Sequence, residues 1–259
     1  MKNNFEKKFT YNQILFRYAK GKSLANGYEI HPYNEILFFI DGGGRLLTEY
    51  FEEKLRNGTL IIIPKNAYHQ ILFSDEPNYI RLVLNFPDIE AVPFPQKNIR
   101  LFYPIPRSIS FLLERIRATL ETDSFKEPSG TLLYGAFLML LAETYADSPQ
   151  QLSPKLRRDD DFITKCIKYI DDNFTSDLSV EKIAKEMSVS PATIFSGFKK
   201  QLGTSIHRYI TEKRLIYAHN LITNNNPPTK IYLDCGYRDY ASFYRAFVKM
   251  FGYPPSMVK

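Results

Sequence analysis

Four side chains near the start of the chain have the types and the spacing that could bind a metal ion or a polar molecule. Glu29, His31 and Glu35 lie close together in the sequence, and His69 follows further along. Imidazole and carboxylate groups that converge on one point are typical ligands of transition metals. The same groups can instead hydrogen-bond a polar organic ligand, or brace the fold from within. The sequence leaves these three uses open.

Short strands would have to position these side chains. Residues 9–86 alternate β-branched and aromatic runs with turn signals rich in Gly, Asn and Pro, which is typical of a small antiparallel barrel or sandwich. We expect Glu29, His31 and Glu35 to occupy alternate positions of one strand and to face one side. His69 would lie on a neighbouring strand. An effector pocket at the barrel mouth would contain His31, Tyr33, Glu35, Tyr68 and His69.

The spacing of these residues resembles the two sequence motifs of cupin barrels. The matching segments are Glu29-x-His31-x-x-x-Glu35-x6-Gly42 and Gly58-x5-Pro64-x-Asn66-x-x-His69. Two positions depart from the motifs, because Glu29 stands in place of a His and Asn66 in place of a Gly. Asn tolerates a positive φ angle, so we expect the turn at Asn66 to survive.

A second group of side chains has the types that contact DNA. In residues 231–258, Phe243, Phe247 and Phe251 recur every four residues and predict a buried helical stripe. Arg245 lies off this stripe. A helix that is apolar on one side and basic on the other, and that follows a short helix and a Gly turn, is typical of helix-turn-helix DNA binding.

Residues 180–203 repeat this layout. Each stretch contains the pattern F-x-K and ends in a glycine, Gly203 or Gly252. A repeat of this kind indicates two copies of one structural unit. A helical run over residues 207–222 lies between them, and residues 161–174 predict a helix that begins the domain.

These C-terminal residues resemble the AraC/XylS family of transcriptional regulators. Residues 236–254, GYRDYASFYRAFVKMFGYP, are similar to the signature near the end of that family, with small changes in spacing. The resemblance implies two helix-turn-helix units joined by a long helix. It also implies a cupin-like sensor of a small molecule, and dimerisation through helices that follow the barrel. Tyr232 stands where the family usually has Ala, so we expect the first helix of the second unit to be short or tilted.

Recognition helices carry the residues that would reach DNA. In the first unit, Ser190 and Pro191 predict the helix start. Arg245 is the one residue of the two helices that could contact guanine with two hydrogen bonds; a phosphate contact or a salt bridge within the domain are its alternatives. The base-reading positions implied by the family fall on Ala192, Phe195 and Ser196. The full set of candidates is Ala192, Thr193, Phe195, Ser196, Lys199, Lys200, Tyr240, Ala241, Tyr244, Arg245 and Lys249.

The middle of the chain predicts helices and a linker. Residues 107–122 and 129–146 have helical patterns, and the second is so apolar that it must be buried. Its partner could be a second subunit or the rest of its own domain. Residues 147–160 are polar and contain prolines, which is typical of a linker. The predicted domains are a cupin-like barrel over 1–104, a helical dimerisation segment over 105–146, the linker over 147–160 and a DNA-binding domain over 161–259.

Composition excludes several other classes of protein. The 259 residues are 44% hydrophobic and carry a net charge of +6, and the two cysteines form no C-x-x-C motif. A disulfide framework and a thiolate zinc site are therefore not expected. We find no signal peptide and no run long enough to span a bilayer, so we expect a cytoplasmic protein without a membrane segment.

The sequence therefore predicts an α+β multidomain protein. An N-terminal cupin-like antiparallel β-barrel is followed by helices, and a C-terminal all-α domain holds two helix-turn-helix units. The expected function is that of a dimeric, non-enzymatic transcriptional regulator that binds double-stranded DNA, responds to a small polar effector such as a sugar, and needs no cofactor. As an activator it would also contact RNA polymerase. Two alternatives remain: a metal-dependent cupin enzyme using Glu29, His31, Glu35 and His69, and a ligand-independent dimeric regulator.

Overall fold

The computed structural model describes residues 5–21, 28–73, 79–89, 98–122, 127–146 and 161–258. It divides into two compact units. The first comprises Met1–Asn26, Tyr33–Leu47 and Glu52–Lys155, and the second comprises Gly27–Pro32, Thr48–Phe51 and Leu156–Lys259. The predicted linker over 147–160 lies outside the described residues. None of the helices in the part of the chain that the structure describes is long and apolar enough to cross a bilayer.

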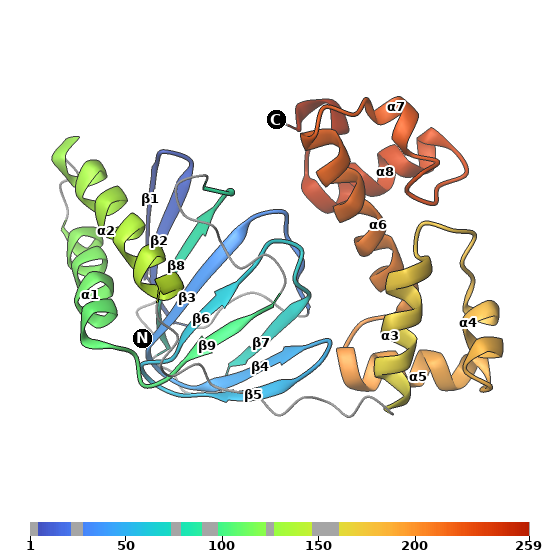
Figure 1. The fold of residues 1–259 in the computed structure, drawn as a ribbon, viewed down its shortest axis with the longest axis horizontal. Helices are drawn as coiled ribbons and strands as arrows, with labels where there is room; N and C mark the ends of the chain where they lie inside the picture. Colours follow the sequence, from blue (N-terminus) through green and yellow to red (C-terminus); the bar gives the residue numbers. More distant parts are fainter. Residues whose placement is uncertain are drawn as a thin grey trace. The chain divides into compact units, whose positions relative to one another are not determined.

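The first unit is built on antiparallel strands (Figure 1). The strands are β1 (Phe5–Tyr11), β2 (Ile14–Lys20), β3 (Asn34–Asp41), β4 (Gly44–Thr48), β5 (Glu52–Leu55), β6 (Leu60–Ile63), β7 (His69–Phe73), β8 (Ile80–Phe86) and β9 (Arg100–Phe102). They form a six-stranded sheet in the order β1-β2-β8-β3-β6-β9 and a three-stranded sheet in the order β5-β4-β7. The predicted antiparallel strands are present, but no strand pairing joins the two sheets within the described ranges, so a closed barrel is not observed.

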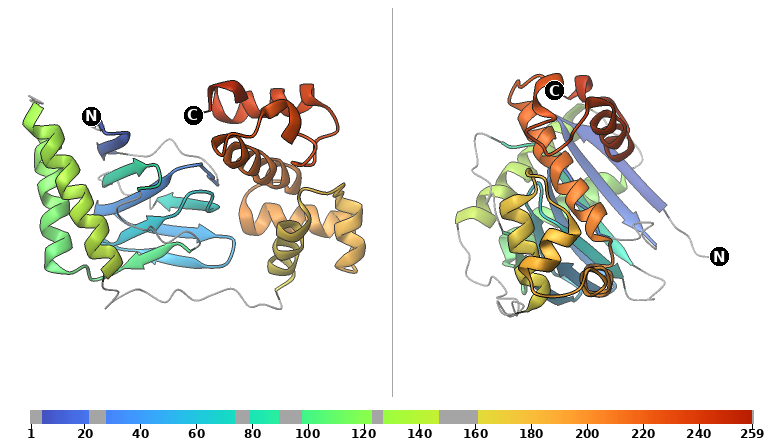
Figure 2. Two further views of the ribbon diagram at one scale, coloured as in Figure 1. Left: turned by 45° about the horizontal axis from the view of Figure 1, so that its top comes forward. Right: turned by 90° about the vertical axis from the view of Figure 1, so that its right-hand side faces the viewer.

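Helices α1 (Arg107–Glu121) and α2 (Glu127–Ala146) cover one face of the six-stranded sheet (Figures 1 and 2). Strand register explains which side chains they cover. Phe16, Leu84, Ile36 and Ile62 lie opposite one another on β2, β8, β3 and β6, so they project from the same face. All four are fully buried in one core with the apolar residues of both helices. Burial of this face stabilises the first unit by the hydrophobic effect.

The apolar face of α2 belongs to this core. Leu133 and Phe137 have no exposed surface, and the Phe137 ring lies 4.9 Å from the ring of Phe86 on β8. Of the two partners that the sequence left open for this helix, Leu133 and Phe137 therefore contact the rest of their own domain. The sequence showed that the helix had to be buried, but the strand surface that covers it lies far away along the chain. The predicted helix boundaries agree with α1 and α2 to within two residues.

The second unit contains the helical C-terminal region. Its elements are α3 (Phe162–Asn173), α4 (Val180–Glu186), α5 (Pro191–Leu202), α6 (Ile206–Thr223), α7 (Pro228–Ile231), α8 (Tyr240–Phe251) and a 3-10 helix (Pro255–Met257). We call α4 and α5 the first helix pair, and α7 and α8 the second helix pair. As expected from the sequence, the helix before the second turn is short, with four residues.

The two helix pairs are delimited by the same local signals. The Ser190 hydroxyl accepts a hydrogen bond from the Thr193 amide at the start of α5, and the Asp239 carboxylate accepts one from the Ser242 amide at the start of α8. Such caps satisfy amide groups that have no partner inside the helix. Both helices end at a glycine with a left-handed backbone, Gly203 at φ 64° and Gly252 at φ 78°, a conformation that glycine adopts without a Cβ clash.

Candidate nucleic-acid interface

Helix α5 presents polar and apolar side chains to solvent on one side. Ile194 and Phe198 are fully buried and hold the helix on its core. The positions between them face outward, because the helical period of 3.6 residues places them on the opposite side. The predicted contact residues of this helix are all exposed: Ala192, Thr193, Phe195, Ser196, Lys199 and Lys200. The Phe195 side chain is 41% exposed, which leaves an aromatic surface available to a partner.

Helix α8 has the same division into a buried and an exposed side. Phe243 and Phe247 are fully buried, whereas Ala241, Arg245 and Lys249 are exposed. Tyr244 on the exposed side retains 41% of its surface. Tyr240 differs from the expectation, because it is half-buried between the rings of Tyr232 and Phe243 at 5.9 and 5.8 Å. A tyrosine at 232, in place of the small residue expected there, contributes to this packing.

Arg245 retains most of its hydrogen-bonding capacity. Its guanidinium donates one hydrogen bond to the Ser242 hydroxyl at 3.2 Å. No carboxylate of the described residues forms an ion pair with it, so the alternative of a salt bridge within the domain is not observed. Guanidinium groups present five donors in a planar arrangement that matches the guanine edge or a phosphate. Arg245 is therefore placed and equipped for either contact.

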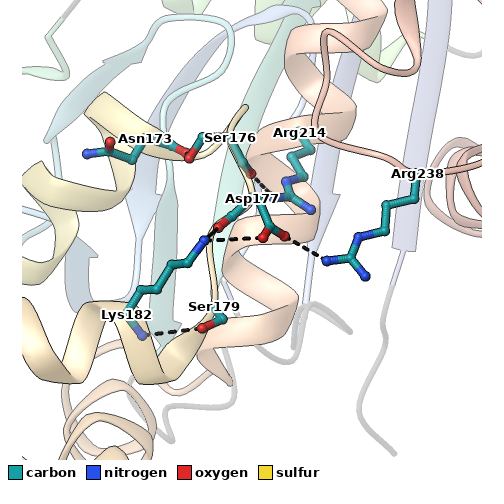
Figure 3. A network of polar contacts seen from close by, with 7 residues as sticks. All are labelled: Asn173, Ser176, Asp177, Ser179, Lys182, Arg214 and Arg238. Carbon is teal, nitrogen blue, oxygen red and sulfur yellow. Dashed lines mark hydrogen bonds and ion pairs between the residues drawn. The ribbon is translucent and has the colours of Figure 1, made fainter.

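A polar network centred on Asp177 connects the two helix pairs (Figure 3). The Asp177 carboxylate pairs with Lys182 of α4 at 3.2 Å and with Arg238, in the turn before α8, at 2.9 Å. Hydrogen bonds from Arg238 and Lys182 lower the pKa of Asp177 below its usual range. The network was missed at the sequence level, because Asp177 and Arg238 lie far apart in the chain.

Arg214 of α6 extends the same network. Its guanidinium donates to the carbonyl oxygens of Phe174 and Ser176, at 2.6 and 2.9 Å, beyond the end of α3. Gly236 lies against this guanidinium with a φ of 77°, and a Cβ atom at that position would lie 2.8 Å from the Arg214 Nε. Only glycine fits there without a shift, so α6 fixes both the end of α3 and the turn before α8.

The predicted effector residues do not form the arrangement expected from the sequence. Glu29 and His31 lie outside the regular strands, and only Glu35 belongs to β3. Moreover, 27–32 belongs to the second unit, whereas the remaining candidates belong to the first. The prediction of one strand carrying Glu29, His31 and Glu35 is therefore wrong. Regular alternation was assumed through Pro32, whose ring prevents it from donating to a strand ladder.

The other effector candidates have varied surroundings. His69 and Tyr68 are buried, and the His69 Nδ1 lies 2.9 Å from the Ala67 carbonyl oxygen. The Glu35 carboxylate accepts a hydrogen bond from the Asn85 amide at 2.8 Å, and Tyr33 is partly exposed. Asn66 has a φ of 67°, so the turn expected there is present. Across the described residues, no three His, Cys, Asp or Glu side chains are grouped so that they could hold a metal ion.

Comparisons with known proteins identify the helical region. Residues 183–259 match a family model described as a helix-turn-helix domain. The Msm operon regulatory protein of Streptococcus mutans is 23% identical over 245 residues, which cover 92% of this chain and 86% of that protein. The HTH-type transcriptional regulator YobQ of Bacillus subtilis is 27% identical over 230 residues, which cover 88% of this chain and 87% of that protein. The lactose operon transcription activator of Staphylococcus xylosus is 24% identical over 147 residues, which cover 56% of this chain and 51% of that protein.

Proposed function

We propose that this chain, a DNA-binding transcriptional regulator of the AraC/XylS type, reads DNA with two helix-turn-helix units. The first helix pair forms one unit and the second helix pair forms the other, with α5 and α8 as recognition helices. The observation that supports this most strongly is the shared design of α5 and α8: each has a side-chain cap at its start and a glycine cap at its end, a buried side that contains phenylalanine and an exposed side with lysine or arginine. We place its DNA-binding domain at residues 161–259.

Recognition helices enter the major groove and read bases with their outward side chains. On α5, Ala192 and Phe195 would contact thymine methyl groups, and Ser196 would hydrogen-bond a base edge. On α8, Arg245 would contact a guanine. Lys199, Lys200 and Lys249 would bind phosphate groups, which fix the position of the protein on the duplex. Thr193, Tyr240, Ala241 and Tyr244 complete the proposed contact surface, although Tyr240 has less free surface than the others.

Substitution of Arg245 tests this assignment in the full-length protein. Selection from a random DNA library gives the preferred site, and footprinting should then show protection of two neighbouring major-groove segments. Arg245→Ala should weaken binding by about 1–3 kcal/mol and relax the preference at one base pair. Arg245→Lys keeps the charge but lacks the planar pair of donors, so it should recover the electrostatic part of the affinity without the full base preference. An equal loss on all DNA sequences would make Arg245 a phosphate contact.

We further propose that the first unit, which contains most of the predicted sensor domain 1–104, senses a small polar molecule such as a sugar. The name of the Staphylococcus xylosus relative, an activator of a lactose operon, supports a sugar. Glu35, Tyr68 and His69, with Tyr33 as a further candidate, supply polar groups for this role, whereas His31 is left out because it belongs to the second unit. The effector would act by binding two states of the protein with different affinity. Thermal unfolding of the full chain with a panel of sugars should show stabilisation by the effector.

The alternatives predict different results. A metal-dependent cupin enzyme would hold stoichiometric metal and would be destabilised by a chelator, and elemental analysis decides this. A ligand-independent regulator would bind DNA equally with and without every compound of the panel. Because the relatives are regulators by name, we propose a non-enzymatic protein of the cytoplasm without a cofactor, and an activator would also contact RNA polymerase.

We propose a homodimer through the outer side of the helical segment 105–146. Phe111 of α1 and Met139 of α2 are 68% and 59% exposed. The Ser108 hydroxyl of α1 donates to the Glu143 carboxylate of α2 at 2.9 Å, so these two residues lie at the same level of the antiparallel helices. Phe111 follows Ser108 by about one helical turn, and Met139 precedes Glu143 by about one turn, so Phe111 and Met139 also lie at one level. Exposed apolar residues that adjoin one another are typical of an interface.

A further inference from the structure

The face of the six-stranded sheet that points away from α1 and α2 carries a cluster of polar side chains. Strand register places Leu15, Asn85 and Glu35 in one row on β2, β8 and β3. Arg17 begins the next row, and Arg81 lies in the row after that. Residues that lie opposite one another on paired strands project from the same face, and diagonal neighbours are within reach of long side chains. Arg17 is thus a diagonal neighbour of both Asn85 and Arg81.

Arg17, Asn85 and Glu35 form a chain of hydrogen bonds. The Arg17 Nη2 donates to the Asn85 Oδ1 at 3.1 Å, and the Asn85 Nδ2 donates to the Glu35 Oε2 at 2.8 Å. Among the described residues, the carboxylate that pairs with Arg17 is that of Glu6 on β1, at 3.8 Å. The Arg17 Nε is buried and has no partner among the described residues. The Nε–H donor of the guanidinium is thus left without an acceptor among the described residues.

Arg81 is a second cation on this face. It donates to the Gly21 carbonyl oxygen at 3.1 Å, and its guanidinium lies 4.9 Å from the centre of the Tyr79 ring. No carboxylate of the described residues forms an ion pair with it. Burial lowers the pKa of Arg81, and the positive charge of Arg17 also lowers it, whereas Tyr79, Glu6 and Glu35 raise it. Two guanidinium groups therefore share this face, and among the described residues neither has a carboxylate oxygen within hydrogen-bond distance.

The Tyr79 hydroxyl is a third group with unused capacity. Tyr79 is 2% exposed, and its hydroxyl is buried without a hydrogen-bond partner among the described residues. Burial raises the pKa of the Tyr79 hydroxyl. The positive charge of Arg81 lowers this pKa and the negative charge of Glu35 raises it, so both side chains act on the hydroxyl electrostatically. Buried polar groups in proteins almost always have partners, and each exception calls for an explanation such as a ligand that is absent.

An anion with hydroxyl groups would satisfy all of these side chains at once. A carboxylate or phosphate accepts paired, charge-assisted hydrogen bonds from guanidinium groups. The Tyr79 hydroxyl can donate to the same anion. Glu35 and the Asn85 side chain offer acceptors to hydroxyl groups of the ligand. The apolar neighbours on this face, Val83 and Leu37, would exclude water and strengthen these contacts.

We propose that this face binds a hydroxylated organic anion, a sugar acid or a sugar phosphate, through Arg17, Arg81 and Tyr79. This proposal rests on the proposed function in one respect, that the first unit senses a small molecule. It adds the chemical class of that molecule and the residues that hold its charge. The neutral part of the ligand lies toward Asn85 and Glu35.

Isothermal titration calorimetry with the full-length protein tests the proposal. The ligands are a panel of sugar acids, among them galacturonate, a panel of sugar phosphates, among them galactose 6-phosphate, the parent neutral sugars and inorganic phosphate. We expect binding of an acid or a phosphate at least about tenfold tighter than that of its parent sugar, because a charge-assisted hydrogen bond contributes about 1.5–3 kcal/mol. Acids and phosphates in parallel distinguish the two sources of the anionic group.

Three variants locate the site. Arg81→Gln should weaken anion binding by about tenfold. Tyr79→Phe removes an oxygen that has no partner among the described residues of the free protein. The variant should therefore keep the thermal stability of the unaltered protein but bind the anion more weakly. Arg45→Gln is the matched control, because it removes the same charge from an exposed residue of β4 that pairs with Glu52; it should leave binding unchanged.

The outcomes separate this proposal from the proposed function. Tight binding of a neutral sugar that Arg81→Gln and Tyr79→Phe leave intact would overturn the anion site and keep the effector-sensing role. No binding of any compound in the panel would overturn both. Equal affinity for inorganic phosphate and the best organic anion would show a site for a free ion, and the claim of a hydroxylated organic ligand would be wrong.

Discussion

Arg245 and Arg238 lie one on α8 and one directly before it, yet the structure gives them different surroundings. Arg238 is paired with Asp177, whereas Arg245 makes a single hydrogen bond to its own helix. A guanidinium that already forms an ion pair with a carboxylate is less available to DNA than one that is hydrogen-bonded only to a hydroxyl, because binding to DNA would break the existing ion pair. At the residue scale, we therefore propose that Arg245 contacts a base and that Arg238 has a positioning role.

The pairing of Asp177 predicts a pH-dependent contribution to stability. Hydrogen bonds from Arg238 and Lys182 depress the pKa of Asp177 in the folded state. A depressed pKa stabilises the fold above the unfolded-state value of about 3.9, and this stabilisation is lost as pH falls through the folded-state value. Asp177→Asn should therefore lower the melting temperature at pH 7, and the difference from the unaltered protein should shrink as the pH falls below about 3.9.

Thermal unfolding followed by circular dichroism between pH 7 and pH 3 measures this effect. The pair is exposed, so we expect a small shift. Asp172→Asn provides a control, since Asp172 lies nearby at the end of α3 and forms no ion pair with the described residues. A constant difference across the pH range would show that the Asp177 carboxylate does not carry the effect.

The sequence predicts some of these residue assignments and not others, for physical reasons. Helical period alone separates Phe243 and Phe247 from Arg245, because burial on a helix follows the local sequence. The partners of Arg17 and Tyr79 depend on which strands lie side by side, and no local signal fixes strand order. The metal-ligand hypothesis was wrong in its geometry for a local reason, because it assumed that a single strand runs through Glu29 and His31 to Glu35 despite Pro32.

Helix α2 illustrates how an element with apolar residues on most sides divides them between core and surface. Its inner side packs on the six-stranded sheet, and Met139 remains on the outer side. The sequence predicted the existence and the length of this helix correctly, because both depend on local pattern. It did not distinguish the two sides, because that distinction depends on the position of the sheet.

Two substitutions in α2 should therefore have opposite consequences. Phe137→Asp places a charge in the core beside Phe86 and should unfold the first unit, since an unpaired buried charge costs several kcal/mol, about 3–5 or more. Met139→Asp changes an exposed residue and should leave a folded monomer if Phe111 and Met139 form the dimer interface. Light scattering coupled to size-exclusion chromatography, with circular dichroism, measures both properties. A Met139→Asp protein that remains dimeric would place the interface elsewhere.

At the scale of the whole molecule, the net charge of +6 is spread over both halves of the chain, so it does not by itself mark a DNA-binding surface. We propose that this surface is marked instead by the exposed cations of α5 and α8, which are Lys199, Lys200, Arg245 and Lys249. Each phosphate that a cation neutralises on binding releases counterions, so affinity falls as salt rises. The slope of log affinity against log salt concentration is therefore proportional to the number of phosphate contacts.

We expect the double substitution of Lys199 and Lys200 by Gln to reduce the slope of log affinity against log salt concentration by about 2, at about 0.9 for each phosphate contact. Lys165→Gln removes a charge from an exposed position of α3 and should leave the slope unchanged. Fluorescence anisotropy with a labelled duplex over a series of salt concentrations gives both slopes. An unchanged slope in the double variant would remove α5 from the phosphate-binding surface.

Helix α6 belongs to two hydrophobic cores at once. Near its start, the Tyr209 ring packs 5.5 Å from Phe198 of α5, and near its end, Leu215 and Ala218 join the core of α8. Arg214, between these contacts, holds the end of α3. Opening one helix pair therefore removes support from the other, so the pairs should lose their structure in a single cooperative step.

In native-state hydrogen exchange, the amides of α5 and α8 should exchange with the same opening free energy and the same denaturant dependence. Two separate energies would mean that each pair unfolds by itself.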